Sequence, residues 1–151
     1  MNNFKALVVA SILASGLASG GVAMADKIEL GAVPAAVTKA FAARYPKLAP
    51  TQAEKEVGKD KVVTYELKAE KTEATFTADG TFLEEETVVA LATLPAAVTK
   101  AFAARYPKAK ADRAEKQVKA DKTTTYELAF TSTKGRTEAT FKEDGAFVEE
   151  E

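Results

Sequence analysis

The stretch Pro34-Ala-Ala-Val-Thr-Lys-Ala-Phe-Ala-Ala-Arg-Tyr-Pro-Lys47 decides the fold, because it occurs twice. It returns unchanged from Pro95 to Lys108, 61 residues further along the chain. Within each copy, apolar residues recur every four positions and alanines favour a helix. The first proline suits the first turn of a helix, and the second proline ends it. Each copy therefore predicts a short helix that opens one structural unit.

The segments after each helix are also shared by the two units, and they predict β-strands. Val63, Tyr65 and Leu67 alternate with polar residues, which is typical of a half-buried strand. Strands are expected at 52–57, 63–68, 72–76 and 81–87, and at the matching positions of the second unit. The predicted fold class is α+β, with two tandem repeats that each contain one helix followed by a four-stranded antiparallel meander.

The second unit is four residues longer than the first. The offset between matched residues is 61 at Tyr65 and Tyr126, but 65 at Phe76 and Phe141. An even insertion keeps every side chain on its original sheet face. The sequence therefore predicts a longer second hairpin that turns around Lys134-Gly135 and carries Phe130. Phe130 either caps the core or forms an exposed anchor for a partner.

The first 25 residues are interpreted as a cleaved secretory signal. An apolar run, Ala6–Leu17, precedes Ala23-Met24-Ala25, which has small residues where a signal peptidase reads. An uncleaved membrane anchor is the alternative. The predicted organisation is a signal at 1–25, a first repeat at 26–87, a linker at 88–93 and a second repeat at 94–151. The expected location is the periplasm or the extracellular space.

Composition excludes several classes of function. The chain contains no histidine and no cysteine, which removes Ser-His-Asp and Cys-His catalysis, imidazole metal sites and thiolate chemistry. Without Lys5, 20 basic and 22 acidic side chains remain after the signal, so neither nucleic acid nor an anionic membrane is an expected partner. A unit of roughly 60 residues is marginal alone, so the two units are expected to touch. No catalytic, cofactor-binding or metal-binding residue is predicted, and no cofactor; oligomeric state and a binding site are left open.

Two carboxylate runs and two Asp-Gly segments are the acidic stretches that could form sites. Glu84-Glu85-Glu86 and Glu149-Glu150-Glu151 are interpreted as solvated strand ends, with a weak cation site as the alternative. Asp79-Gly80 and Asp144-Gly145 lack the other ligands of a calcium loop and predict plain turns. Aromatic residues at matched positions of both units predict core: Tyr45/Tyr106, Tyr65/Tyr126, Phe41/Phe102, Phe76/Phe141 and Phe82/Phe147.

The face of each sheet that its helix leaves uncovered is predicted to be polar and open. It would carry these residues: Thr64, Glu66, Glu73, Thr75, Thr125, Glu127, Glu138 and Thr140. If the two sheets met edge to edge, this face would form one broad surface rich in threonine and glutamate. Such a face either keeps the protein soluble or docks a protein or peptide.

The order of core and turn residues resembles the PepSY-like domains grouped with β-lactamase-inhibitor-like proteins. The residues that carry the resemblance are Leu94-Pro95, Val98, Phe102, Tyr106-Pro107, Tyr126-Glu127-Leu128, Phe141 and Asp144-Gly145, and Val33-Pro34 to Asp79-Gly80 match the same pattern. The resemblance implies an exported bacterial protein, and the family's name suggests inhibition of a hydrolase or peptidase. The analogous tandem inhibitor clasps its enzyme with a concave sheet and carries disulfides, whereas this chain has no cysteine.

The sequence thus predicts an exported, non-catalytic binding module of the PepSY-like and β-lactamase-inhibitor-like type, without enzyme activity. It would inhibit or regulate a hydrolase or peptidase through its open sheet face. Two alternatives stay open: a structural or stress-related envelope protein without a tight partner, and a weak cation-binding module that uses the glutamate runs.

Overall fold

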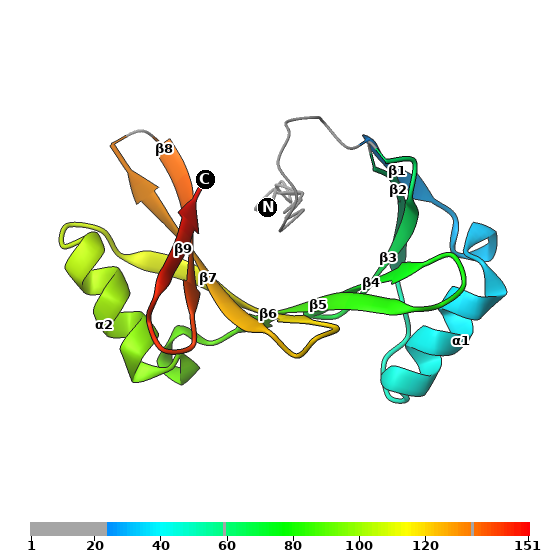
Figure 1. Ribbon diagram of the computed structural model, residues 1–151, viewed down its shortest axis with the longest axis horizontal. Helices are drawn as coiled ribbons and strands as arrows, with labels where there is room; N and C mark the ends of the chain where they lie inside the picture. The colour runs from blue at the N-terminus through cyan, green and yellow to red at the C-terminus, as the bar shows by residue number, and fades with distance from the viewer. Residues whose placement is uncertain (1–23, 59, 134) are drawn as a thin grey trace, which may run out of the picture.

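The computed structural model describes residues 24–58, 60–133 and 135–151. These residues form one antiparallel sheet of nine strands that pair in chain order, with two α-helices and two short 3-10 helices (Figure 1). The strands are β1 (Met24–Ile28), β2 (Gln52–Val57), β3 (Val63–Ala69), β4 (Thr72–Thr77), β5 (Phe82–Val89), β6 (Ala111–Lys119), β7 (Thr124–Ser132), β8 (Gly135–Lys142) and β9 (Phe147–Glu150). The helices are α1 (Ala35–Arg44) and α2 (Ala96–Arg105), each preceded by a 3-10 helix, η1 (Leu30–Ala32) or η2 (Leu91–Thr93).

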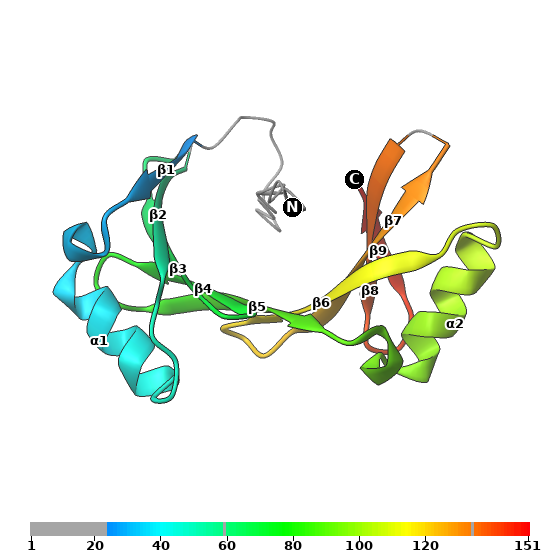
Figure 2. The same cartoon turned by 180° about the vertical axis from the view of Figure 1, so that it is seen from behind.

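The sheet is bent into a trough, and both α-helices lie on its outer, convex side (Figures 1 and 2). Helix α1 packs against β4 and helix α2 packs against β8. Strand β5 lies at the middle of the trough, between β4 and β6. Among the described residues, no helix lies on the concave side, so the polar face of the sheet stays open there.

In both copies of the repeated stretch, the two prolines set where the helix begins and where it ends. Helix α1 begins directly after Pro34, and its buried residues are Val37 and Phe41. It ends where the backbone N–H of Tyr45 donates to the carbonyl of Phe41, immediately before Pro46. Helix α2 repeats this arrangement 61 residues later, as predicted.

Two separate hydrophobic cores lie between the helices and the sheet. The first contains Val33, Val37, Phe41, Ala53, Leu67, Ala69, Ala74 and Phe76. The second contains Val98, Phe102, Ala114, Tyr126, Leu128, Phe130, Ala139 and Phe141. Most of the matched aromatic residues lie in or against these cores, but Phe147 is 37% exposed and is covered by the guanidinium of Arg105 at 3.5 Å.

The prediction of two helix-plus-four-strand repeats was wrong. The described chain is one continuous nine-stranded sheet, because β5 pairs with β4 along one edge and with β6 along the other. Strand β1, which precedes the first helix and pairs with β2, was not predicted. A strand's two edges bear the same backbone groups, so side-chain alternation indicates that a strand forms but not which strands flank it.

The predicted signal peptide lies largely outside the described residues, which begin at Met24. The predicted cleavage point after Ala25 falls inside β1. Of the predicted linker at 88–93, Val88 and Val89 are the last residues of β5, and Leu91–Thr93 form η2. Neither helix of the described part is long and apolar enough to cross a membrane.

The longer second hairpin is formed by β7 and β8, and it places Phe130 in the core. Phe130 is 1% exposed and lies 5.1 Å from Phe102 and 4.5 Å from Tyr106 between ring centroids. The exposed-anchor alternative for Phe130 was therefore wrong. The residue that matches it in the first unit is Ala69, so the larger side chain belongs to the lengthened hairpin.

Candidate functional site

The concave face of the sheet is the candidate site, and strand alternation decides which side chains it carries. The cross-strand pairs Glu66 with Thr75 and Glu127 with Thr140 place the predicted polar residues on the side opposite the helices. The predicted edge-to-edge arrangement is also present, since β5 and β6 join the two halves. The open polar face is therefore one surface across all nine strands.

Glutamates outnumber basic residues on this concave face. By strand register, the described strands place ten glutamates on it: Glu54, Glu56, Glu66, Glu73, Glu84, Glu86, Glu115, Glu127, Glu138 and Glu149. They place six basic residues on it: Lys27, Lys68, Arg113, Lys119, Arg136 and Lys142. A concave surface with an excess of one charge focuses its electrostatic field into the concavity.

The glutamates of β5 lie at the centre of the trough rather than at a solvated strand end. Glu84 and Glu86 point to the concave face, paired across the strands with Thr75 and Glu73. Glu85 points to the helix side, where it accepts a hydrogen bond from the hydroxyl of Tyr45. The predicted strand end was wrong for this run, because β5 continues to Val89 and pairs with β6 along this stretch.

Burial and mutual repulsion hold protons on the central carboxyls. Burial, followed by the charges of Glu115 and Glu84, raises the pKa of Glu86 to about 9. Burial, followed by the charges of Glu138 and Glu115, raises the pKa of Glu127 to about 7. Burial likewise raises the pKa of Glu66 to about 7, against the opposing hydrogen bond from Lys68. A cation that enters this face would therefore displace protons as well as water.

One internal cation already lies on this face, in the first half of the sheet. The Lys68 ammonium is 2.9 Å from Glu66 Oε1, 3.1 Å from Glu73 Oε2 and 3.7 Å from Glu54 Oε1. Burial lowers the pKa of Lys68, but the contacts with these carboxylates outweigh it and hold the pKa above its ordinary range. Lys68 is thus a charged group that contacts three glutamate side chains.

In the second half of the sheet, the glutamates of the concave face contact different groups. The guanidinium of Arg113 pairs with Glu115. Gln117 donates to Glu127 at 3.4 Å and accepts from Thr125 at 2.8 Å. These contacts form a polar row along β6 and β7, in which the Arg113 guanidinium, the Gln117 amide and the Thr125 hydroxyl take the place of the Lys68 ammonium.

In the part of the chain that the structure describes, no three His, Cys, Asp or Glu side chains are placed to hold a metal ion. The Asp79-Gly80 and Asp144-Gly145 segments form turns, in which the aspartates accept from the backbone N–H of Thr81 and Ala146 at 3.1 and 2.9 Å.

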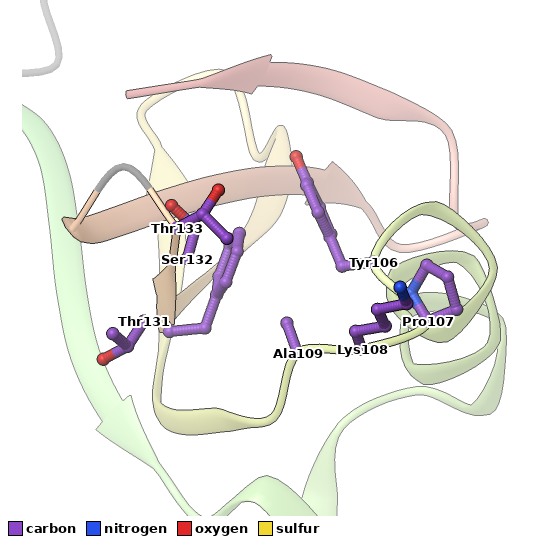
Figure 3. A pocket seen from close by; sticks show the side chains of 8 residues that line it. Tyr106, Pro107, Lys108, Ala109, Thr131, Ser132 and Thr133 are labelled. Carbon is purple, nitrogen blue, oxygen red and sulfur yellow. The ribbon is translucent and has the colours of Figure 1, made fainter.

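A separate cavity of about 410 Å³ lies between the end of α2 and the β7–β8 hairpin (Figure 3). Figure 3 shows Tyr106, Pro107 and Lys108 on one side of it and Thr131–Thr133 on the other. Its lining of ring carbons, methyls and hydroxyls includes one charged group, Lys108, and no acid–base pair. The cavity therefore lacks a pair of groups that could transfer a proton. The concave face is the stronger candidate for the functional site.

Sequence reasoning found the polar face but missed the contrast between Lys68 and Ala129. The segments Thr64–Lys68 and Thr125–Ala129 read Thr-Tyr-Glu-Leu-Lys and Thr-Tyr-Glu-Leu-Ala. Aligning the two repeats residue by residue would have located this difference. Its meaning depends on the carboxylates of β2 and β4, which only pairing brings to Lys68.

The fold and the site define a class of protein: a small scaffold with one bent sheet, helices on its convex side and an open acidic concave face. The chain belongs to the family described as "Putative beta-lactamase-inhibitor-like, PepSY-like", which matches residues 23–83 and 68–149. The two matches overlap at 68–83, next to the β5 junction. Comparison with curated protein sequences gave no match.

Several solved structures share this fold. A BLIP-like protein from Bacteroides fragilis is 22% identical, with 78% of this chain and 85% of that chain covered, at a TM-score of 0.60. A "putative periplasmic" protein from Bacteroides eggerthii is 18% identical, with 79% and 88% covered and a TM-score of 0.60. A DUF2874 family protein from Bacteroides uniformis is 16% identical, with 78% and 88% covered and a TM-score of 0.61. Likeness at these identities shows a common fold.

Proposed function

We propose that this protein is an exported, non-catalytic binding module that docks a basic segment of a protein partner in its concave sheet face. The observation that carries the proposal is the row of glutamates across the trough, with Glu84 and Glu86 at its centre. Charge complementarity selects a lysine- or arginine-rich segment and steers its approach. Where the partner is a hydrolase or peptidase with basic residues around its active site, such docking inhibits it.

Export to the periplasm is part of the same proposal. The signal-like residues at 1–25 support it, as does the description of a solved structure of the same fold as a periplasmic protein. A partner in that compartment would meet the concave face directly, because both helices lie on the convex side.

The proposal is tested with octalysine as a cationic probe and ¹⁵N-labelled protein in NMR titration at low ionic strength. Residues that face the trough should shift, while the backbone signals of α1 and α2 should stay in place. The double variant Glu84→Lys, Glu86→Lys should weaken binding strongly, and added salt should weaken it for the wild type. An octaglutamate peptide serves as the control of opposite charge.

Two results would count against this function. Shifts confined to the helices or to the cavity beside Tyr106 would place the binding surface elsewhere. Equal binding of octalysine by the wild type and the double variant would show that the central glutamates take no part.

A further inference from the structure

Strand β9 repeats the first part of strand β5. Residues 82–86 read Phe-Leu-Glu-Glu-Glu, and residues 147–151 read Phe-Val-Glu-Glu-Glu. Both segments pair with the preceding strand in the same way, since Thr75 pairs with Glu84 and Thr140 pairs with Glu149. Both ladders also shift register at the neighbouring pair of phenylalanines. The two segments therefore have the same backbone arrangement.

The contacts of these two segments with the helices match as well. In each half, an arginine guanidinium from the helix lies over the ring of the phenylalanine, and a tyrosine hydroxyl donates to the middle glutamate. The matching contacts are Arg44 over Phe82 at 3.7 Å, Arg105 over Phe147 at 3.5 Å, Tyr45 to Glu85 and Tyr106 to Glu150.

The two segments differ in what lies along their other edge. Strand β5 pairs there with β6, whereas β9 is an edge strand of the sheet that the structure describes. Phe147, Val148 and Glu150 are accordingly exposed, while the three matching residues of β5 are partly buried. The exposure of β9 is therefore the exposure that β5 would have without β6.

The outer edge of β9 offers backbone groups for one further strand. The N–H and C=O of Glu151 bond to Glu138 on β8, both at 2.9 Å. Successive residues of a strand direct these groups to opposite edges, so those of Glu150 point outward. An edge of this kind is a template for pairing with another segment.

Strand β6 shows which sequence covers such an edge. Its residues Gln117, Val118 and Lys119 pair, in reverse order, with the three glutamates of β5. Alternation places Gln117 and Lys119 on the concave face and Val118 on the helix side. The covering segment thus sets a lysine and an amide among glutamates and an apolar side chain on the other face.

We infer that β9 is a docking edge for an extended, lysine-bearing segment of the partner, which adds one strand to the sheet as β6 does on β5. This inference rests on the proposed function and specifies it: the basic segment would bind at the β9 rim of the trough, with a lysine opposite Glu149 and backbone hydrogen bonds to Glu150. In such strand addition, main-chain hydrogen bonds give affinity and alternate side chains give specificity.

The probe is a synthetic peptide with the sequence of residues 113–120, which belong to β6. It is titrated into the ¹⁵N-labelled protein at low ionic strength. The backbone signals of β9 should shift, while those of β1 at the opposite edge of the sheet should stay in place. A scrambled peptide of the same composition is the control, because it keeps the charge and loses the strand pattern.

Two N-methylated forms of the peptide separate strand pairing from charge attraction. In β6 the N–H of Ala120 donates to the carbonyl of Leu83, so alternation directs the N–H of Val118 to β5 as well. The N–H of Lys119 points away from β5 and donates to Thr123. N-methylation at Val118 should therefore weaken binding to β9 at least about tenfold, whereas N-methylation at Lys119 should change it little.

A charge reversal tests the register of the added strand. Glu149→Lys should weaken binding of the peptide by about tenfold, and the peptide with Lys119→Glu should bind this variant better than it binds the wild type. Glu143→Lys is the control, because it makes the same change at an exposed residue in the turn after β8 and should leave binding nearly unchanged.

The outcomes separate this inference from the proposed function. Equal binding of the two N-methylated peptides, or shifts that leave β9 unaffected, would overturn the docking edge, and octalysine binding in the trough would still support the proposed function. If neither the peptide nor octalysine binds the wild-type protein, both are overturned. Shifts in β9 with the peptide and none in the trough with octalysine would support the docking edge and overturn docking across the trough.

Discussion

Two glycines fix the β4–β5 and β8–β9 turns against the helices. Gly80 and Gly145 have φ angles of +86° and +87°, a region that favours glycine. A Cβ atom at Gly80 would lie 2.6 Å from the carbonyl oxygen of Ala36, and one at Gly145 would lie 2.7 Å from that of Ala97. The close approach lets each turn pack on the first turns of its helix.

Gly80→Ala should therefore lower the free energy of unfolding by about 1–3 kcal/mol, from backbone strain together with the contact to Ala36. Urea denaturation monitored by circular dichroism measures the change. Gly31→Ala is the control, since a Cβ atom there meets nothing within 4 Å. Equal stability of the two variants would show that the turn can move away from the helix at little cost.

The protons held by the concave face make stability depend on pH. Glu86 has a pKa of about 9 in the folded protein, against an ordinary value of 4.5. Between these values the folded state binds a proton that the unfolded state lacks, so stability falls as pH rises through this window. Glu66 and Glu127, each with a pKa of about 7, act in the same direction.

We expect the free energy of unfolding to be higher near pH 5 than near pH 9, and Glu86→Gln to reduce this difference. The glutamine stays neutral at both pH values, so the variant lacks one carboxyl group whose pKa is raised in the folded state. Denaturation midpoints across the pH series provide the measurement, with Glu143→Gln as control. A wild-type protein that gains stability on going from pH 5 to pH 9 would contradict the raised pKa values.

At the scale of the elements, the lengthened β7–β8 hairpin changes the second core. Phe130 enters that core beside Phe102 and Tyr106, where the first half has Ala69. The extra strand length adds two cross-strand pairs, Thr131–Arg136 and Ser132–Gly135, beyond the Phe130–Thr137 pair that matches Ala69–Thr72. The hairpin thus contributes hydrophobic burial on the helix side while leaving the concave face polar.

Phe130→Ala should cost about 3–5 kcal/mol, because it removes a ring from a packed core. Thermal and urea unfolding measure this loss, and Thr131→Ala on the exposed side of the same strand is the control. Octalysine binding should survive at temperatures where the variant is folded, since Phe130 lies on the opposite face from the glutamates. Unchanged stability would mean that neighbouring side chains repack to fill the space left by the ring.

At the scale of the whole molecule, β5 joins the two halves of the sheet, each of which covers one hydrophobic core. It pairs with β4 from Thr72 to Phe76 and with β6 from Ala114 to Lys119. Neither half keeps all its strand pairs without β5, so the two halves should unfold together.

A core substitution in one half should consequently be detected in the other. Phe130→Ala should increase hydrogen exchange in α1 as well as in α2 under conditions where global unfolding limits exchange. Mass spectrometry of the two helical peptides, which carry the same repeated stretch but different flanking residues, gives the comparison. Faster exchange in α2 alone, or two separate urea transitions, would show that β5 does not couple the halves.

The sequence by itself determined the two helices, the strand alternation, the glycine turns and the polar residues of the open face. These follow from local periodicity and from backbone preferences, which act within a few residues. The signal-like segment and its cleavage remain predictions.

Only the tertiary structure decided that β5 joins both halves, that β1 completes the sheet, and that the face is concave and acidic at its centre. It also decided that Lys68 meets three glutamates from three strands, while Arg113 pairs with Glu115 in the second half. Strand edges are chemically alike, and sheet curvature arises from all the pairings together, so these features depend on contacts between residues far apart in the chain.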